Sequence, residues 1–148
     1  MQFNGTRICK GSRATAWQVA TNVEHWPEWT ASVTRIQRLG GGPVHVGSRA
    51  RVEQPGMQPL VWTVTRVEPE QRFDWETRTA GIRIAASHLI EPSDDGVVIT
   101  NGLGMNGWLA ALVAPFIRNR VQRFIEMETE GWKRRSETIE TGTTSHAD

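Results

Sequence analysis

The chain has one cysteine, no tyrosine and no long apolar run. A single cysteine, Cys9, excludes an internal disulfide and a cysteine-rich zinc site, and we interpret it as a packed strand residue. Without tyrosine, no phenol is present to act as an acid, a hydrogen-bond donor or a radical site. No apolar run approaches the roughly 20 residues that span a bilayer, and the first ten residues lack the apolar core of a signal peptide. We therefore expect a cytoplasmic protein with no stable membrane insertion.

An excess of charge of one sign is also missing. The 17 basic and 16 acidic residues leave a formal charge of +1, and the basic residues are spread along the chain. This balance gives no general reason to expect binding to nucleic acid or to an anionic membrane. No histidine pair has the helical spacing of metal ligands, no carboxylates cluster, and no phosphate-binding loop is present. We expect no metal and no cofactor.

What the chain does have is the size of one domain and many tryptophans. At 148 residues, with 38% hydrophobic residues, it is long enough to bury a substantial core. Seven tryptophans are more than a core of this size needs, and several fall where a pocket is expected. We expect one domain over residues 1–137, followed by a polar tail over residues 138–148.

The first third of the chain predicts a strand and two short helices. Residues 3–10 favour a strand, and Ser12 is a good N-cap for a helix over residues 13–21. Pro27 disfavours helical backbone at Trp26, so the tryptophan-rich segment that follows is predicted to be a turn or a short helix starting near the proline.

The middle of the chain predicts strands separated by turns. Apolar and β-branched residues mark six further strands, at 33–39, 48–54, 60–68, 72–79, 82–91 and 97–103. The turns between them hold glycine and proline, as in the Pro92 to Gly96 segment. Because the connections are short, consecutive strands are predicted to pair antiparallel.

The last element is a long amphipathic helix over residues 108–137. Its apolar side chains recur at spacings of three and four, at Val113, Ile117, Val121, Phe124, Ile125 and Trp132. Pro115 is expected to kink this helix or to mark the start of its main part. From Pro115 onward the helix is roughly 35 Å long. The carboxylates of Glu126, Glu128 and Glu130 are interpreted as part of an ion-paired solvent face.

These elements predict an α+β fold: a curved antiparallel sheet of about seven strands wraps a long C-terminal helix, with two short helices after the first strand. A single long helix cannot bury its apolar stripe alone, so the concave face of the sheet must receive it. A strongly bent sheet does not close tightly at both ends of the helix. The predicted consequence is an internal apolar cavity.

At this point the chain resembles the superfamily of START, Bet v 1-like and polyketide cyclase/dehydrase (SRPBCC) proteins, which have the helix-grip fold. The resemblance covers residues 3–137. It is carried by the helix with Trp17, by Trp26-Pro27-Glu28-Trp29, by Val61-Trp62 and Val67-Glu68-Pro69, by Phe73-Asp74-Trp75, by Pro92 with Asp95-Gly96, and by the long helix ending in Lys133 to Glu137. The resemblance implies a pocket for lipids, sterols, polyketides or other hydrophobic molecules, and it implies no single reaction.

Strand alternation places Trp62, Val64 and Arg66 on one face of the sheet. Some aromatic polyketide cyclases carry a similar strand with tryptophan, serine and arginine at these positions, whose hydroxyl and guanidinium hold the substrate. Val64 here removes the hydroxyl. Arg66 is either a solvated or salt-bridged charge, or an inward cation that needs a carboxylate partner or an anionic ligand.

His88 lies in an otherwise apolar row of a predicted strand, together with Ile84. One interpretation is a neutral core histidine with one hydrogen bond. The other is a polar group that orients a ligand or acts as a general base. Arg120, on the helix, is either a surface charge or a partner for a ligand carboxylate.

The first functional hypothesis is binding of a hydrophobic small molecule or lipid between sheet and helix. The predicted ligand-binding residues are Trp26, Trp29, Trp62, Trp75, Ile84, His88, Trp108, Leu112, Phe116 and Arg120. The second hypothesis is an enzyme of the cyclase/dehydratase type, with His88 or Arg66 as catalytic candidates. A third is an interaction domain that delivers or senses a ligand within a larger complex. We expect a monomer or a homodimer and no nucleic-acid partner.

Overall fold

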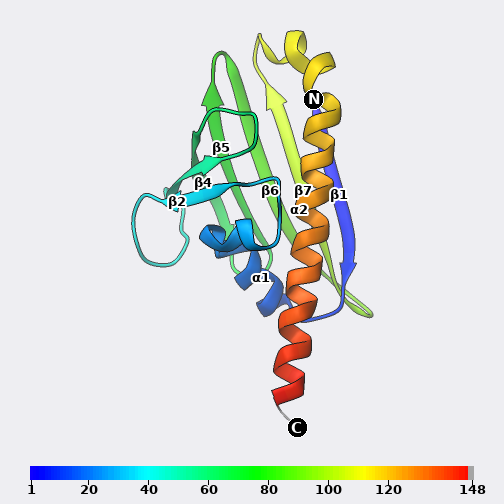
Figure 1. Cartoon of the computed structure of the whole chain (residues 1–148). Coiled ribbons are helices and arrows are strands. Elements are labelled where there is room, and N and C mark those ends of the chain that lie inside the picture. Colours follow the sequence, from blue (N-terminus) through cyan, green and yellow to red (C-terminus); the bar gives the residue numbers. More distant parts are fainter. Residues whose placement is uncertain (147–148) are drawn as a thin grey trace.

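The computed structural model describes residues 1–146 (Figure 1). Along the chain, the elements are β1 (Gln2–Cys9), α1 (Arg13–Thr21), the 3-10 helix η1 (Val23–Glu28), β2 (Arg35–Arg38), β3 (Arg49–Glu53), β4 (Leu60–Glu68), β5 (Arg72–Thr79), β6 (Ile82–Ser93), β7 (Gly96–Asn106) and α2 (Ala110–His146). The seven strands form one antiparallel sheet in the order β1-β7-β6-β5-β4-β3-β2. From β2 to β7 each strand pairs with the next one along the chain, whereas β1 pairs with β7 and forms the edge opposite β2.

The predicted α+β helix-grip architecture is confirmed. The sheet curves, and α2 runs along its β1 and β7 side, as Figure 1 shows. The bounds predicted for α1, β4 and β5 agree with the structure, because capping at Ser12 and turn residues after each strand mark their ends locally. Strands β6 and β7 are longer than predicted, since they pair with each other from Arg83 and Asn106 down to Ser93 and Gly96.

The expected end of the long helix at Glu137 is wrong, because α2 continues to His146. The polar residues that suggested a tail satisfy their hydroxyls within the helix. Thr138 donates to the carbonyl of Arg134 at 2.8 Å, and Thr141 donates to that of Glu137 at 2.9 Å. Such bonds to the preceding turn make threonine compatible with a helix despite its low propensity.

Pro115 lies within α2, in its second turn. It has no N–H to donate to the carbonyl of Ala111, so the ladder of helical hydrogen bonds is interrupted there. The first turns of α2 are set at an angle to the rest of the helix in Figure 1. The helix itself begins at Ala110, which leaves Trp108 in the preceding turn.

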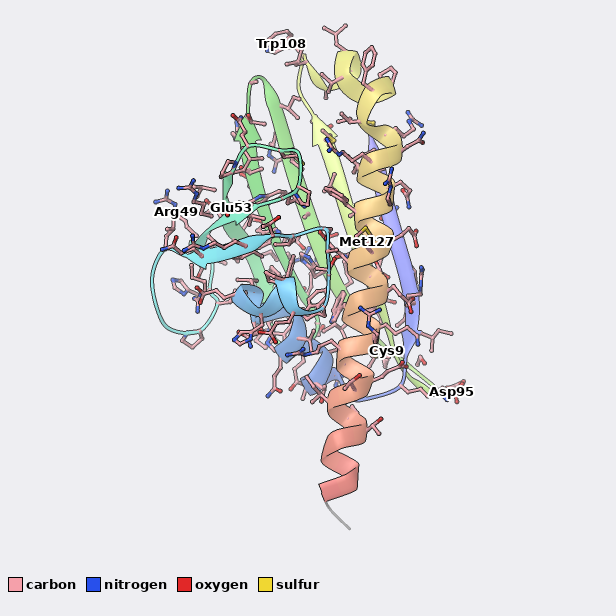
Figure 2. The ribbon with its side chains drawn as sticks, viewed as in Figure 1. Cys9, Arg49, Glu53, Asp95, Trp108 and Met127 are labelled. Atoms are coloured by element: carbon pink, nitrogen blue, oxygen red, sulfur yellow. The ribbon has the colours of Figure 1, made fainter. Side chains whose placement is uncertain are left out.

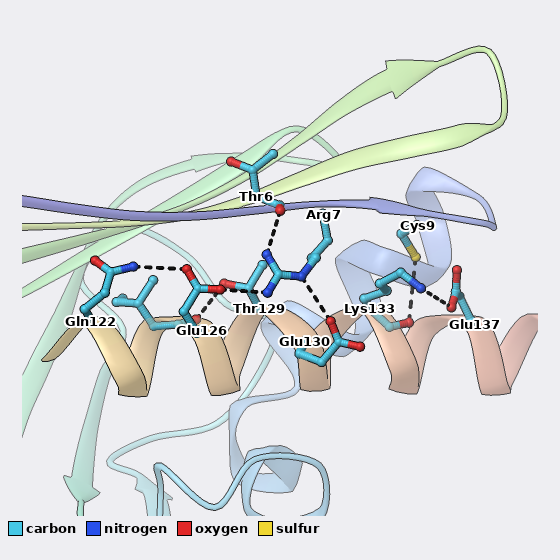
Figure 3. A network of polar contacts seen from close by, with 10 residues as sticks. Thr6, Arg7, Cys9, Gln122, Glu126, Thr129, Glu130, Lys133 and Glu137 are labelled. Atoms are coloured by element: carbon cyan, nitrogen blue, oxygen red, sulfur yellow. Dashed lines mark hydrogen bonds and ion pairs between the residues drawn. The ribbon is translucent and has the colours of Figure 1, made fainter. Parts of the chain in front are cut away.

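α2 is fastened to the edge strand β1 by close packing and by charge (Figure 3). Gly5 lets the helix come so near that a Cβ there would lie 2.6 Å from Thr129 Oγ1. Beside this contact, Arg7 donates from Nη2 to Glu126 at 2.7 Å and from Nε to Glu130 at 3.0 Å. The charged clamp is half exposed, so its net effect on stability is modest.

Tryptophan side chains join α2 to α1 and η1 to α1. Trp132 is 1% exposed, and its Nε1 donates to the carbonyl of Ala16 at 2.9 Å. Trp26 donates from Nε1 to the carbonyl of Ala20 at 3.1 Å. Gly131 lets the backbone of Trp29 cross α2 closely, since a Cβ at Gly131 would lie 2.2 Å from Trp29 O.

Residues 1–146 contain neither a membrane-spanning helix nor a cluster of metal-ligand side chains. No helix among residues 1–146 is long and apolar enough to cross a membrane. Within the same part of the chain, no three His, Cys, Asp or Glu side chains gather as metal ligands do.

Gly131→Ala is expected to destabilise the protein by about 1–3 kcal/mol, because the added methyl group overlaps the Trp29 carbonyl and backbone must move. Gly142→Ala is the matched control, since it adds the same group to the same helix where nothing lies within 4 Å. The control is expected to be neutral or stabilising by up to about 1 kcal/mol. Urea unfolding measures both; equal effects of the two substitutions would contradict the close crossing.

Candidate functional site

A cavity of about 140 Å³ lies between the sheet and α2. Its wall is mostly apolar and comes from β3 to β7, η1, the segment after β3 and one face of α2. The lining residues are Trp26, Val33, Val52, Gln54, Met57, Leu60, Trp62, Trp75, Ile84, Ala86, His88, Asn101, Gly102, Leu103, Met105, Ile117, Arg120, Val121, Phe124, Ile125 and Glu128. An apolar wall with a few polar groups is the usual form of a small-molecule site.

Three tryptophans form one wall of the cavity. The ring of Trp75 lies 5.4 Å from that of Trp26 and 5.6 Å from that of Trp62, with tilted planes in both pairs. The residues come from β5, η1 and β4, so η1 and the sheet meet at this cluster. Each ring is at most 7% exposed. The cluster fixes the shape of the cavity and offers π surfaces to anything inside it.

His88 is buried among aromatic rings. It stacks on Phe73 with ring centroids 4.2 Å apart, while Trp26, Trp75 and Trp132 meet it edge-on. Nδ1 lies 3.3 Å from the Phe73 carbonyl, which accepts a hydrogen bond when that nitrogen carries the proton. Burial lowers the pKa of His88 to about 4, against a small opposing effect of that hydrogen bond. The ring is therefore neutral at physiological pH.

Glu128 is the carboxylate of the cavity. It projects from α2, and Oε1 accepts a hydrogen bond of 3.0 Å from the hydroxyl of Ser32. Ser32 is fully buried, and its carbonyl accepts from Gln54 Nε2 at 3.2 Å. Among the described residues no cation pairs with Glu128. Burial raises the pKa of Glu128 to about 7, although the Ser32 bond opposes the shift.

The sequence analysis placed Glu128 on a solvent face, which is wrong. Glu126 and Glu130 do face outward, where they bind Arg7. Glu128, however, follows Val121 by seven residues and Phe124 by four, so helical periodicity sets it on the apolar stripe. That spacing was the signal available, and the alternation of acidic residues at every second position concealed it.

The entrance to the cavity lies between α2 and the segment that joins β3 to β4. Met57 and Arg120 line the cavity and are also exposed. The guanidinium of Arg120 rests on Gly56, where an added Cβ would lie 2.1 Å from Nη2. Gly56 has a φ of +73°, a left-handed conformation that suits glycine. Arg120 makes no ion pair with the described residues, and its side chain covers the entrance to the cavity.

The structure brings six of the predicted ligand-binding residues together around the cavity: Trp26, Trp62, Trp75, Ile84, His88 and Arg120. Trp29 lies outside it. Its ring packs on Trp26 at 5.5 Å, and its carbonyl accepts from Arg134 at 3.1 Å, so it joins η1 to α2. Asn101, 3% exposed, is a further polar lining residue that sequence reasoning missed.

Three residues predicted to face the pocket point to solvent. Trp108, Leu112 and Phe116 are 75%, 64% and 87% exposed. The indole of Trp108 rests on Gly81, in the turn between β5 and β6, and Figure 2 shows it at the end of the molecule. Adjacent residues point about 100° apart around a helix of 3.6 residues per turn. The stripe of Leu112 and Phe116 therefore lies off the face of Ile117 and Val121, which lines the cavity.

Arg66 also lies outside the cavity, as a salt-bridged charge, which was one of its two interpretations; what the structure corrects is its placement by alternation on the face of Trp62 and Val64. The register of β4 against β5 shifts between Val64 and Arg66. This β-bulge breaks the two-residue alternation, so Val64 remains buried while Arg66 points outward. There Arg66 Nη2 pairs with Glu68 at 3.0 Å. Arg66 is not among the residues that line the cavity.

A known family matches nearly the whole chain. The family model described as "Polyketide cyclase / dehydrase and lipid transport" matches residues 2–137, and the chain belongs to this family. No curated protein sequence matches the chain.

Solved structures share the fold at low sequence identity. A hypothetical protein from Helicobacter pylori has a TM-score of 0.79 and 16% identity, over 92% of this chain and 88% of that one. The di-domain ARO/CYC StfQ of the steffimycin biosynthetic pathway has a TM-score of 0.76 and 12% identity, over 93% and 51%. Ara h 8.0201 has a TM-score of 0.64 and 11% identity, over 89% and 97%. The chain thus shares the helix-grip fold of these structures.

The pKa of Glu128 predicts a pH dependence of stability. Because folding raises it from the ordinary 4.5 to about 7, the folded state holds the proton more tightly, and stability falls as pH rises through this interval. We expect the unfolding free energy of wild type, relative to that of Glu128→Gln, to decrease by roughly 1–3 kcal/mol as the pH rises from about 4.5 to 8. His88 has the opposite slope, with stability lost as pH falls from 6.5 to about 4, and it cancels in the difference.

Urea unfolding across this pH range provides the measurement. Glu91→Gln, at an exposed position on β6, is the control and is expected to leave the slope unchanged. A difference between wild type and Glu128→Gln that does not vary with pH would contradict a buried carboxyl at this position.

Proposed function

We propose that this protein binds a compact apolar molecule in the cavity between the sheet and α2. The observation that carries the proposal is the cavity itself, with three tryptophans on one wall and aliphatic side chains of α2 on the other. Membership of a family with ligand-binding folds supports it.

The cavity volume favours a small ligand over a lipid. About 140 Å³ is comparable to cavities of about 150 Å³ that accept a benzene ring. Drug-sized ligands occupy roughly 300–1,000 Å³. A molecule of one ring fits without rearrangement, whereas a two-ring molecule or a lipid chain requires Arg120 and Met57 to move from the entrance. For a ligand with about ten heavy atoms we expect a Kd between about 1 mM and 1 μM.

Polar groups in the cavity would orient the ligand. Neutral His88, the amide of Asn101 and the carboxyl of Glu128 are set among apolar side chains. A protonated Glu128 can donate a hydrogen bond to a carbonyl or hydroxyl oxygen, and Asn101 can donate or accept one. A ligand with one or two such oxygens on an apolar ring system is the best match to this arrangement.

Glu128 also favours a second candidate function, acid–base catalysis of the cyclase or dehydratase type. A carboxyl whose pKa lies at about 7 can donate or accept a proton near neutrality. His88, the earlier candidate, is neutral and could assist as a base or a hydrogen-bond partner. This candidate requires that a bound molecule reach Glu128.

Calorimetric titration with compact aromatic alcohols and ketones tests the binding proposal. Ile117→Trp puts a larger side chain on the cavity face and is expected to weaken binding at least about 10-fold, since the ligand loses its space. Asn119→Trp makes the same addition two residues along α2, at an exposed position, and is expected to leave affinity unchanged. Equal affinity in both variants would place binding elsewhere, and no heat with any apolar compound would refute the proposal.

Glu128→Gln separates binding from catalysis. If the carboxyl only orients the ligand, the variant is expected to change the Kd less than about 10-fold, because an amide still forms hydrogen bonds. If it transfers a proton, turnover of a reactive polyketone is expected to fall about 100-fold or more while binding persists. His88→Ala is tested in parallel. Turnover that is unaffected by Glu128→Gln removes this residue from any mechanism.

A further inference from the structure

Three exposed apolar side chains belong neither to the core nor to the cavity wall. Trp108, Leu112 and Phe116, with exposures of 75%, 64% and 87%, follow one another along the start of α2. Trp108 is the one exposed tryptophan of the seven in the chain. Met57, 40% exposed, lies at the entrance of the cavity across from α2. Contiguous large apolar side chains in solvent mark an interaction surface.

The end of the molecule that carries these residues has no carboxylate. Four segments meet there (Figure 1): residues 54–60 after β3, the turn 77–82, the end of β7 with the following turn, and α2 as far as Phe124. None of them contains Asp or Glu. They contain four arginines, Arg78, Arg118, Arg120 and Arg123. We call this end of the molecule the entrance face, because the cavity opens within it.

The arginines of the entrance face are available to a partner. All are exposed, and they form no ion pair with any described residue. On the helix, Arg120 and Arg123 follow Phe116 by four and seven residues, so they share its side of α2. Apolar rings and free cations are therefore combined on one surface, although the chain as a whole is nearly neutral.

We propose that the entrance face docks on the surface of an anionic phospholipid bilayer. Tryptophan, leucine and phenylalanine bordered by arginine are the composition of helices that lie in the membrane interface. Such a bilayer offers both the apolar interior and the negative headgroups that this surface matches, at roughly 1 kcal/mol per Arg near it. A second copy of the chain would bring four arginines against four and be repelled.

Docking would direct the cavity entrance to the bilayer. Met57 and Arg120 belong both to the entrance face and to the cavity wall. A headgroup phosphate that binds Arg120 would draw its guanidinium from Gly56, which it now covers. Compact apolar molecules concentrate in bilayers, so a docked protein could exchange them directly. Docking itself does not depend on whether the cavity is filled, and its test is independent of ligand binding.

The experiment is co-sedimentation of the full chain with vesicles. Vesicles of phosphatidylcholine alone are compared with vesicles in which about a third of the lipid is phosphatidylglycerol. We expect binding at least about 10-fold tighter to the anionic vesicles, and a decrease at high salt as the charges are screened. Brominated acyl chains are expected to quench the emission of Trp108, and Trp108→Phe to remove that quenching.

Variants assign the binding to this surface. Leu112→Ser with Phe116→Ser, and separately Arg120→Gln with Arg123→Gln, are each expected to weaken vesicle binding about 10-fold or more. The matched controls remove similar groups elsewhere: Ile8→Ser with Val46→Ser, and Arg35→Gln with Arg49→Gln, all at exposed positions. The controls are expected to bind as wild type does, and thermal unfolding checks that each variant is folded.

Several results would overturn the proposal. They are absence of binding to anionic vesicles, equal binding to neutral ones, or equal losses in the variants and their controls. A dimer in sedimentation velocity that Leu112→Ser with Phe116→Ser disperses would assign the surface to self-association instead. Loss of ligand binding in Ile117→Trp with unchanged vesicle binding would support both proposals separately.

Discussion

The close attachment of α2 to one edge of the sheet is the constraint on which the rest of the structure depends. Gly5 admits Thr129 against β1, Arg7 holds two glutamates of the helix, and Gly131 admits the backbone of Trp29 on another side. These contacts fix the C-terminal two thirds of α2 over β1, β7 and α1. The curved sheet continues past the helix to β2, and the space between is only partly filled by tryptophan rings. The cavity is the remainder of that space.

This arrangement explains why polar groups persist inside an apolar wall. His88 and Glu128 are held where water is scarce, so each pKa moves toward the neutral form, downward for the imidazole and upward for the carboxyl. A buried carboxyl without a cation costs stability, and an apolar residue at position 128 would pack without that cost. Groups of this kind are concentrated at functional sites. Glu128 therefore supports a ligand role for the cavity more strongly than the apolar residues alone.

The relatives with the same fold differ from this chain in almost nine of ten residues, so they share the architecture rather than the side chains of the site. The family fixes a sheet that grips a helix, and the residues within the gap decide what is held there. In this chain those residues make a small cavity with one carboxyl, one neutral histidine and one amide. The arginine-rich, carboxylate-free end around its entrance is a second feature of this chain's own sequence.

The sequence by itself determined the elements, their order and the antiparallel pairing, because caps, turn residues and apolar periodicity act over a few neighbouring positions. It also indicated Trp62, Trp75 and His88 as cavity residues, since alternation within a regular strand sets which side chains share a face. Trp26, in η1, was indicated by the family resemblance instead. Only the tertiary structure decided the cases in which the rotation or register of an element matters. A bulge turned Arg66 outward, and the rotation of α2 exposed Phe116 and turned Glu128 toward the cavity. Such choices depend on contacts between segments far apart in the chain, and no local pattern encodes them.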